Sequence, residues 1–344
     1  MNTFTLRNKA TDCLYKMRKR SSLKLEKLSL LPDSPKLSDS PKISYGDIFK
    51  RLLVGDLGYA LGRFYFVRRA YSTGMKLKQS TLKTSSDLRF RSQITGVDAL
   101  DVEEIVADVK RFAYCDRLQL QHSAVAAIKH HAESSPLCAM SMKSSFALAK
   151  QHAKSSVLHD QPVRSLPSYW DIKKNPSAYK KVAMVEVQNS IGIEEIYKLR
   201  YDDFLLKLAE RYLGYKPEKC DVKLWWSFAN DLSSQERRSQ NQTIDYHYDI
   251  YGFNSFYINF YLTDVDSTSG AHVLVKSSHR RKKMSLLLRS ARVSEDIIRR
   301  EYEKDAITIV EGKAGACFVE DASCFHKALP PVTKDRLFLQ LRYL

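Results

Sequence analysis

Short runs of alternating apolar and polar residues fill the last third of the chain. Eight such runs follow Pro217, are rich in aromatic and β-branched residues, and are separated by Gly, Ser, Asp or Pro. They are VKLWWSF, YHYDIYGF, SFYINFYLTDV, HVLVKSS, ITIVEG, ACFVED, CFHKAL and RLFLQLRYL. Because a strand places every second side chain on one face, these runs predict β-strands. Eight short strands with one helical insert near residues 294–303 predict a sandwich or barrel of the jelly-roll type.

Helical periodicity precedes the strands. Apolar residues recur at three- and four-residue spacing in three segments, 98–113, 117–132 and 193–215. We expect an amphipathic helix in each of them, the last ending at Gly214. Helices followed by strands predict an α+β fold in which the helices support one face of the sheet.

The first 95 residues carry most of the positive charge. They contain 20 Lys and Arg against 7 Asp and Glu, whereas the rest of the chain contains 36 against 32. Two Ser-Pro steps predict a flexible tail, and apolar residues at helical spacing among arginines then predict a basic amphipathic segment. That segment either packs on the body or, with the tail, contacts an anionic membrane surface. The predicted parts are the tail (1–45), the amphipathic segment (46–95) and a folded domain (96–344), whose helical support spans 96–216 and whose strands span 217–344.

Composition narrows the class of protein. The 344 residues are 44% hydrophobic and 28% charged, with 15 Phe and 19 Tyr, which excludes a wholly disordered chain. No apolar run approaches the roughly 18 residues that a membrane-spanning helix needs. Six cysteines without a CxxC pair favour a reducing compartment such as the cytoplasm. The net charge of +17 suggests nucleic-acid binding, but that function needs basic and aromatic residues interleaved on the folded body, so we keep it only as an alternative.

The run YHYDIYGF contains candidate metal ligands. His247 and Asp249 stand two residues apart, so a strand would place both side chains on the same face. His326, near the end of a later run, could supply a third ligand. Two imidazoles and one carboxylate on one face of a metal leave three positions open, which suits non-haem Fe(II) and oxygen chemistry. A His-x-Asp pair by itself is more often a surface hydrogen-bonding couple.

The last run, RLFLQLRY, separates a leucine face from a mostly polar face. Leu337, Leu339 and Leu341 alternate with Arg336, Phe338, Gln340 and Arg342. If the leucines meet the helices, Arg336 points into the barrel, where a guanidinium needs an anion. Residues 256–262 alternate in the same way, with Tyr257 and Asn259 on the polar face. Two polar inward faces predict a ligand cavity, and the alternative is that both faces point to solvent.

Taken in order, these motifs resemble the phytanoyl-CoA dioxygenase family. The resemblance covers residues 220–344 and rests on HYD (247–249), YLTDVDSTSGAHVLVKSSHRRKK (261–283) and GKAGACFVEDASCFHKALPPVTKDR (312–336). The chain departs from the family at Gly270-Ala271, where Gly-Pro is usual, and at Ser277-Ser278, where Gly-Ser is usual. The resemblance implies a double-stranded β-helix, a cupin-like jelly roll, with Fe(II) and the co-substrates 2-oxoglutarate and O2.

The resemblance also implies residue roles. The implied iron ligands are His247, Asp249 and His326; Arg336 would bind the distal carboxylate of 2-oxoglutarate, and Asn259 and Tyr257 would make further co-substrate contacts. The expected reaction hydroxylates an unactivated carbon of a small-molecule, lipid or sugar-type metabolite and releases succinate and CO2. A catalytically silent binding module on the same scaffold is the alternative. We expect His279 to be structural and the basic run 280–283 to lie beside the pocket mouth, where it could receive an anionic substrate.

Overall fold

The computed structural model describes residues 52–53, 55–81, 88–139 and 165–344. All of them belong to one compact unit, residues 41–344. The predicted tail, residues 1–45, lies outside the described residues.

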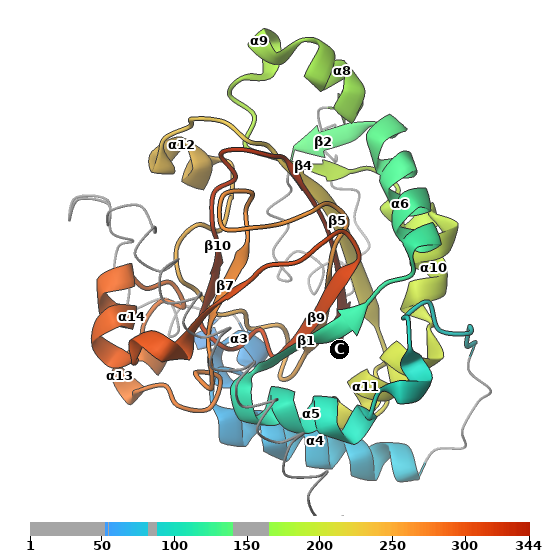
Figure 1. The fold of residues 1–344 in the computed structure, drawn as a ribbon. Coiled ribbons are helices and arrows are strands. Elements are labelled where there is room, and N and C mark those ends of the chain that lie inside the picture. The colour runs from blue at the N-terminus through green and yellow to red at the C-terminus, as the bar shows by residue number, and fades with distance from the viewer. Residues whose placement is uncertain (1–51, 54, 82–87, 140–164) are drawn as a thin grey trace, which may run out of the picture. The chain divides into compact units, whose positions relative to one another are not determined.

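Eleven strands are found in the described part of the chain (Figure 1). They are β1 Tyr114–Gln119, β2 Leu137–Ala139, β3 Ser165–Leu166, β4 Met184–Val187, β5 Cys220–Ser227, β6 Phe256–Tyr261, β7 His272–Val275, β8 Ile307–Val310, β9 Ala316–Glu320, β10 His326–Ala328 and β11 Arg336–Tyr343. They form an eight-stranded sheet in the order β1-β9-β6-β11-β5-β4-β2-β3 and a three-stranded sheet in the order β10-β7-β8. Strand pairing within both sheets is antiparallel.

From β6 onward the chain passes back and forth between the two sheets. β6, β9 and β11 lie in the larger sheet, whereas β7, β8 and β10 lie in the smaller one. The two sheets therefore form the double-stranded β-helix that the sequence predicted, within an α+β fold.

Helices cover one face of the larger sheet. The α-helices are α3 Leu57–Leu61, α4 Tyr65–Ser80, α5 Val102–Phe112, α6 His122–Ser134, α8 Tyr169–Lys174, α9 Pro176–Tyr179, α10 Glu194–Arg200, α11 Asp203–Leu213, α12 Ser234–Ser239, α13 Met284–Leu287 and α14 Glu295–Glu301. Apolar residues of α5, α6, α10 and α11 join those of β6 and β11 in one hydrophobic core. Burial of this apolar area is the main force that holds the helices to the sheet.

β11 confirms the alternation predicted for the last run. Leu337, Leu339 and Leu341 belong to the core beneath the helices. Arg336, Phe338, Gln340 and Arg342 line a cavity on the opposite face of the sheet. The alternative of a solvent-facing polar side is therefore wrong.

Two predicted helices differ in the structure. The first part of the segment 117–132 belongs to β1, which pairs with β9, and α6 begins only at His122. The segment 193–215 is two helices, because Asp202 caps α11 by accepting hydrogen bonds from the backbone N–H groups of Phe204 and Leu205. An N-cap residue has non-helical backbone angles, so it ends one helix and starts another.

The predicted strand YHYDIYGF is also irregular. Its residues form only isolated bridges, from Tyr246 to Val293 and from His247 to His326. The backbone here is therefore held by two single bridges, one to Val293 before α14 and one to His326 of β10, and not by a continuous ladder of strand hydrogen bonds.

The part of the amphipathic segment that is described packs on the body. Arg68 of α4 is buried, and its Nη1 lies 2.8 Å from both carboxylate oxygens of Asp321, directly after β9. Membrane contact of residues 1–95 stays a prediction. Among the described helices, none is both long and apolar enough to cross a membrane.

Candidate functional site

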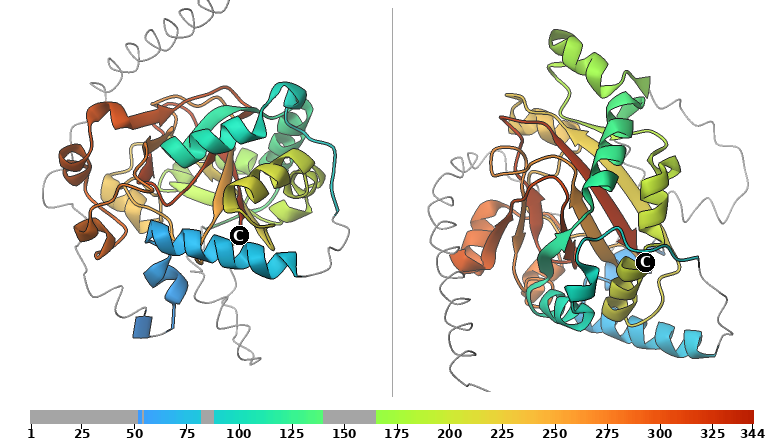
Figure 2. Two further views of the ribbon diagram at one scale, coloured as in Figure 1. Left: turned by 90° about the horizontal axis from the view of Figure 1, so that it is seen from below. Right: turned by 45° about the vertical axis from the view of Figure 1, so that its right-hand side comes forward.

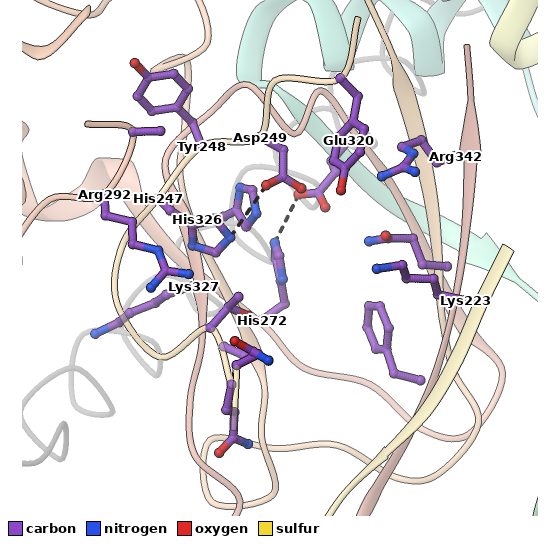
Figure 3. A pocket seen from close by; sticks show the side chains of 18 of the residues that line it. Lys223, His247, Tyr248, Asp249, His272, Arg292, Glu320, His326, Lys327 and Arg342 are labelled. Atoms are coloured by element: carbon purple, nitrogen blue, oxygen red, sulfur yellow. Dashed lines mark hydrogen bonds and ion pairs between the residues drawn. The ribbon is translucent and has the colours of Figure 1, made fainter. Parts of the chain in front are cut away.

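A cavity of about 470 Å³ lies between the two sheets and contains the predicted metal ligands (Figure 3). The ligand atoms of His247, Asp249 and His326 all lie within 4.8 Å of one another. The centres of the His247 and His326 rings are 4.3 Å apart, and Nε2 of His247 is 3.8 Å from Oδ1 of Asp249. These three side chains form a group that could hold a metal ion.

Backbone hydrogen bonds bring the three ligands together across a large sequence distance. The N–H of His247 donates to the carbonyl of His326 at 2.9 Å, and the N–H of His326 donates back at 2.7 Å. The N–H of Asp249 donates to the carbonyl of Ala322 at 2.8 Å. The segment 247–249 is thereby fixed against the segment 322–326.

Each histidine presents the same nitrogen to the cavity. Nδ1 of His247 lies 3.0 Å from the carbonyl of Asp245, and Nδ1 of His326 lies 3.0 Å from the carbonyl of Cys324. Because a carbonyl only accepts hydrogen bonds, both Nδ1 atoms donate and both Nε2 atoms keep a free lone pair. This outer-shell arrangement is the one by which proteins orient metal-binding histidines.

Electrostatics favour the protonation states that a metal requires. Burial and, to a smaller extent, the neighbouring His326 lower the pKa of His247 to about 4, so His247 is neutral near pH 7. Burial by itself raises the pKa of Asp249, but His326, His247 and the hydroxyl of Tyr257 outweigh burial and leave that pKa below its usual value. A neutral imidazole and an ionised carboxylate are the forms that bind metal ions.

Tyr257 and Asn259 lie behind the cavity wall. The hydroxyl of Tyr257 donates to Oδ2 of Asp249 at 3.0 Å. The amide of Asn259 donates to Glu320 at 2.9 Å and accepts from Gln340 at 3.1 Å. Neither residue is among those that line the cavity, so the structure places Tyr257 as a support for Asp249, and the co-substrate contacts of both residues stay predictions.

A buried acid–imidazole pair beside the triad was missed from the sequence. Oε2 of Glu320 lies 3.0 Å from Nε2 of His272, and the His272 ring stacks on His326 at 5.2 Å. Both residues line the cavity. They lie in different sheets, β9 and β7, so no sequence spacing could have paired them.

Glu320 also belongs to a second group of possible ligands, with Cys324 and His326. Both carboxylate oxygens of Glu320 already have partners, Asn259 and His272. Burial raises the pKa of Cys324 well above its usual value, so its sulfur stays a thiol and a poor ligand. The chemistry of the donors therefore favours the group that contains His247 and Asp249.

Arg336 lies in the same cavity without an acidic partner. It is buried, and it donates to the carbonyl of Gly270 and, at 3.3 Å, to the hydroxyl of Ser227. Its Nε has no hydrogen-bond partner, and no ion pair to it is found among the described residues. Burial lowers the pKa of Arg336 to about 10, so the side chain stays charged. A buried guanidinium without a carboxylate is costly and marks a place for an anion.

Two of the other four cations of the cavity wall have acidic partners. Arg342 pairs with Asp221 at 2.6 Å, and Lys327 pairs with Glu295 at 2.6 Å. Lys223 and Arg292 form no ion pair with any described residue, but they are half-buried and exposed, respectively. Arg336 differs from all four because it is buried and also lacks an acidic neighbour.

The basic run 280–283 lies elsewhere than expected. None of its residues lines the metal cavity: Arg280 lines a second cavity, and the ammonium of Lys282 lies over the rings of Tyr248 and Phe325. The position of these charges depends on the direction in which the chain leaves β7, and the sequence does not reveal that direction. His279 has a structural contact, as expected, since its Nε2 lies 3.2 Å from the carbonyl of Lys110.

Among known proteins, this chain is similar to solved structures but matches no family model and no curated sequence. AviO1 from Streptomyces viridochromogenes Tue57 is 14% identical, with 71% of this chain and 95% of that chain covered and a TM-score of 0.42. EctD from S. alaskensis, solved with 2-oxoglutarate and 5-hydroxyectoine, is 13% identical, with 76% and 84% covered and a TM-score of 0.43. The epimerase SnoN, in complex with Fe3+, alpha ketoglutarate and nogalamycin RO, is 16% identical, with 71% and 83% covered and a TM-score of 0.40.

Proposed function

We propose that this protein is an Fe(II)- and 2-oxoglutarate-dependent dioxygenase related to the phytanoyl-CoA dioxygenase family. The observation that carries the proposal is the convergence of the donor atoms of His247, Asp249 and His326 in one cavity with Arg336. The proposed reaction is hydroxylation of an unactivated carbon in a small-molecule, lipid or sugar-type metabolite.

The residues present fit both the metal and the co-substrate. Two free Nε2 lone pairs and one carboxylate supply three ligands and leave further positions open, as non-haem Fe(II) oxygenases require. Arg336, with its unpartnered Nε, would hold the distal carboxylate of 2-oxoglutarate in a fork of N–H donors. When bound, Fe(II) with 2-oxoglutarate and O2 supplies the oxidising chemistry, which consumes the keto acid to succinate and CO2.

The protein's own part is ligation, orientation and exclusion of water. Tyr257 holds one oxygen of Asp249, so the other oxygen is free to bind the metal. Phe338 lies beneath the guanidinium of Arg336, with 4.9 Å from its ring centre to Cζ, and shields that charge from water. The volume of about 470 Å³ lies within the range of about 300–1,000 Å³ that is typical of small-molecule sites.

The rest of the chain has proposed roles as well. We propose that residues 1–45 form a tail, residues 46–95 a basic segment that packs through α4, and residues 96–344 the oxygenase domain. All five cysteines of the described residues are free thiols, which supports a reducing compartment such as the cytoplasm. Residues 1–95 would add peripheral contact with an anionic membrane.

The decisive experiment measures succinate. Protein loaded with Fe(II) under anaerobic conditions is given 2-oxoglutarate and then O2, with and without panels of candidate metabolites. We expect succinate release by the native protein and none by Asp249→Ala. Asp245→Asn is the matched control, because it changes a nearby carboxylate but keeps the backbone carbonyl that holds His247. Binding of both Fe(II) and 2-oxoglutarate without succinate from any panel would favour the silent binding module.

A further inference from the structure

A second cavity lies outside the barrel, beside α4. Its volume is about 380 Å³, and its walls come from α4, the C-terminal ends of α5 and α11, and residues 279–280. Figure 2 shows these three helices gathered at one end of the unit, away from α8 and α9. Nothing in the proposed oxygenase chemistry uses this cavity.

The wall of the second cavity has a one-sided charge. Five of its residues are basic and none of the described ones is acidic: Arg68, Arg69, Lys110, Arg211 and Arg280. Acidic residues beyond the wall neutralise two of them, since Asp321 pairs with Arg68 and Glu103 pairs with Arg211.

The other three basic residues, Arg69, Lys110 and Arg280, form no ion pair with any residue that the structure describes. Three uncompensated positive charges around one hollow create a field that attracts anions.

Two buried atoms of the wall lack hydrogen-bond partners. Arg68 and His279 are 5% and 3% exposed, and both line the cavity. The two terminal nitrogens of Arg68 are used by Asp321 and by the carbonyl of His279, but its Nε is unpartnered. Nδ1 of His279 is also unpartnered, but Nε2 donates to a carbonyl, so Nδ1 of the neutral ring is an acceptor and offers nothing to an anion. Buried polar groups are nearly always paired in native proteins, so the free N–H of Arg68 indicates a missing acceptor.

We propose that the second cavity binds a phosphate group, carried by a free phosphorylated metabolite or by a lipid headgroup. Several arginines approach from different elements, and the three terminal oxygens of a phosphate monoester can accept from all of them, whereas a carboxylate has only two oxygens. Hydroxyl groups of Ser72 and Thr73 on α4 add neutral donors to the same wall.

The lipid source is considered because α4 also carries exposed apolar side chains. Phe66 and Leu77 are 70% and 64% exposed. Side chains of this kind beside a basic cavity are typical of surfaces that meet a lipid headgroup and the acyl region below it.

The test uses the full-length protein and two probes. Inositol trisphosphate, a soluble probe, is titrated by calorimetry, and phosphatidylcholine vesicles with and without phosphatidylinositol phosphate are used in sedimentation. The variant is Arg69→Gln/Arg280→Gln, which removes two exposed, unpaired charges and spares the buried Arg68. We expect its affinity for the bound probe to fall at least about tenfold, which corresponds to about 1.4 kcal/mol.

Two controls separate the site from general electrostatics. Lys180→Gln/Lys181→Gln removes the same charge at exposed positions that directly follow α9, at the opposite end of the unit in Figure 1, and should bind like the native protein. Arg336→Leu should also retain binding, because it alters only the metal cavity.

The outcomes identify the source of the phosphate. Binding of the soluble probe without binding to phosphoinositide vesicles assigns a free phosphorylated ligand, whereas binding to the phosphoinositide vesicles assigns a lipid headgroup. The proposal is overturned if neither probe binds the native protein, if both double variants lose binding equally, or if Arg336→Leu abolishes it.

Discussion

The metal cavity and the second cavity, the basic one beside α4, differ in how their charges are balanced. In the metal cavity acidic and basic residues share the wall, and Glu320 contacts His272 while Lys327 pairs with Glu295. In the second cavity the described wall contains five basic residues and no acidic one, and three of these positive charges are unpaired. The metal cavity can therefore bind a metal cation through its carboxylate and imidazoles as well as an anion at Arg336, whereas the second cavity offers a site for anions alone.

The two cavities meet at one short segment. Asp321 pairs with Arg68 of the second cavity, and the carbonyl of the next residue, Ala322, accepts from the backbone of Asp249 in the metal cavity. The end of β9 thus supports both sites, one through a side chain and the other through the backbone. The following predictions test whether the two cavities are as different in chemistry as they are in charge.

The largest effect is expected for the metal ligands. Each of His247→Ala, Asp249→Ala and His326→Ala should lower Fe(II) affinity by more than about 100-fold, because even outer-shell changes at metal sites cost about 10- to 100-fold. Anaerobic equilibrium binding measures the effect. Glu320→Gln is the control, since it changes the other carboxylate near His326. Loss of iron in Glu320→Gln together with retention in Asp249→Ala would assign the metal to the other group.

A smaller effect is expected at Arg336, the buried arginine of the metal cavity that has no acidic partner among the described residues. Arg336→Leu should weaken 2-oxoglutarate binding by about 2–4 kcal/mol, the scale for losing one partner of a buried charge pair. Arg336→Lys should keep only part of the binding free energy that Arg336→Leu loses, because lysine lacks the planar fork of N–H donors. Anaerobic calorimetry of the Fe(II)-loaded protein measures both. Arg342→Leu serves for comparison, because Arg342 is already paired with Asp221. A loss confined to Arg342→Leu would transfer the role to that residue.

The smallest effect concerns Lys282, whose ammonium lies over Tyr248 of the metal cavity wall and near Arg68 of the second cavity. Burial, followed by the charge of Arg68, lowers the pKa of Lys282 to about 7. An unfolded lysine titrates near about 10.4, so between these pH values the unfolded chain binds more protons than the folded one. The free energy of unfolding should therefore rise with pH in that window, by up to about 1.4 kcal/mol per pH unit from this group.

Urea unfolding of the native protein and of Lys282→Met, at pH about 7 and about 9, measures this contribution. In Lys282→Met the free energy of unfolding should not show the increase with pH that Lys282 adds. Lys283→Met, at an exposed neighbouring position, should keep that increase. Parallel pH dependence of the native protein and Lys282→Met would show that Lys282 keeps its proton in the folded state.

The sequence by itself determined the features that depend on local periodicity. Alternation along β11 separated Leu337 and Leu339 from Arg336, and the structure confirms both faces. Two-residue spacing placed His247 and Asp249 together, although the backbone there forms only isolated bridges. Such patterns can be predicted from the sequence because successive side chains of any extended strand point to opposite faces, whichever strand it pairs with.

Only the tertiary structure decided the features that depend on pairing between distant segments. Residues 117–119 of β1 were predicted as part of a helix, because their strand conformation comes from pairing with β9 and not from their own pattern. The contact of Glu320 with His272 and that of Arg68 with Asp321 join different elements. The second cavity likewise forms where two helix ends and a loop converge on α4. Local sequence sets which face a side chain occupies, but long-range packing sets which side chain it meets.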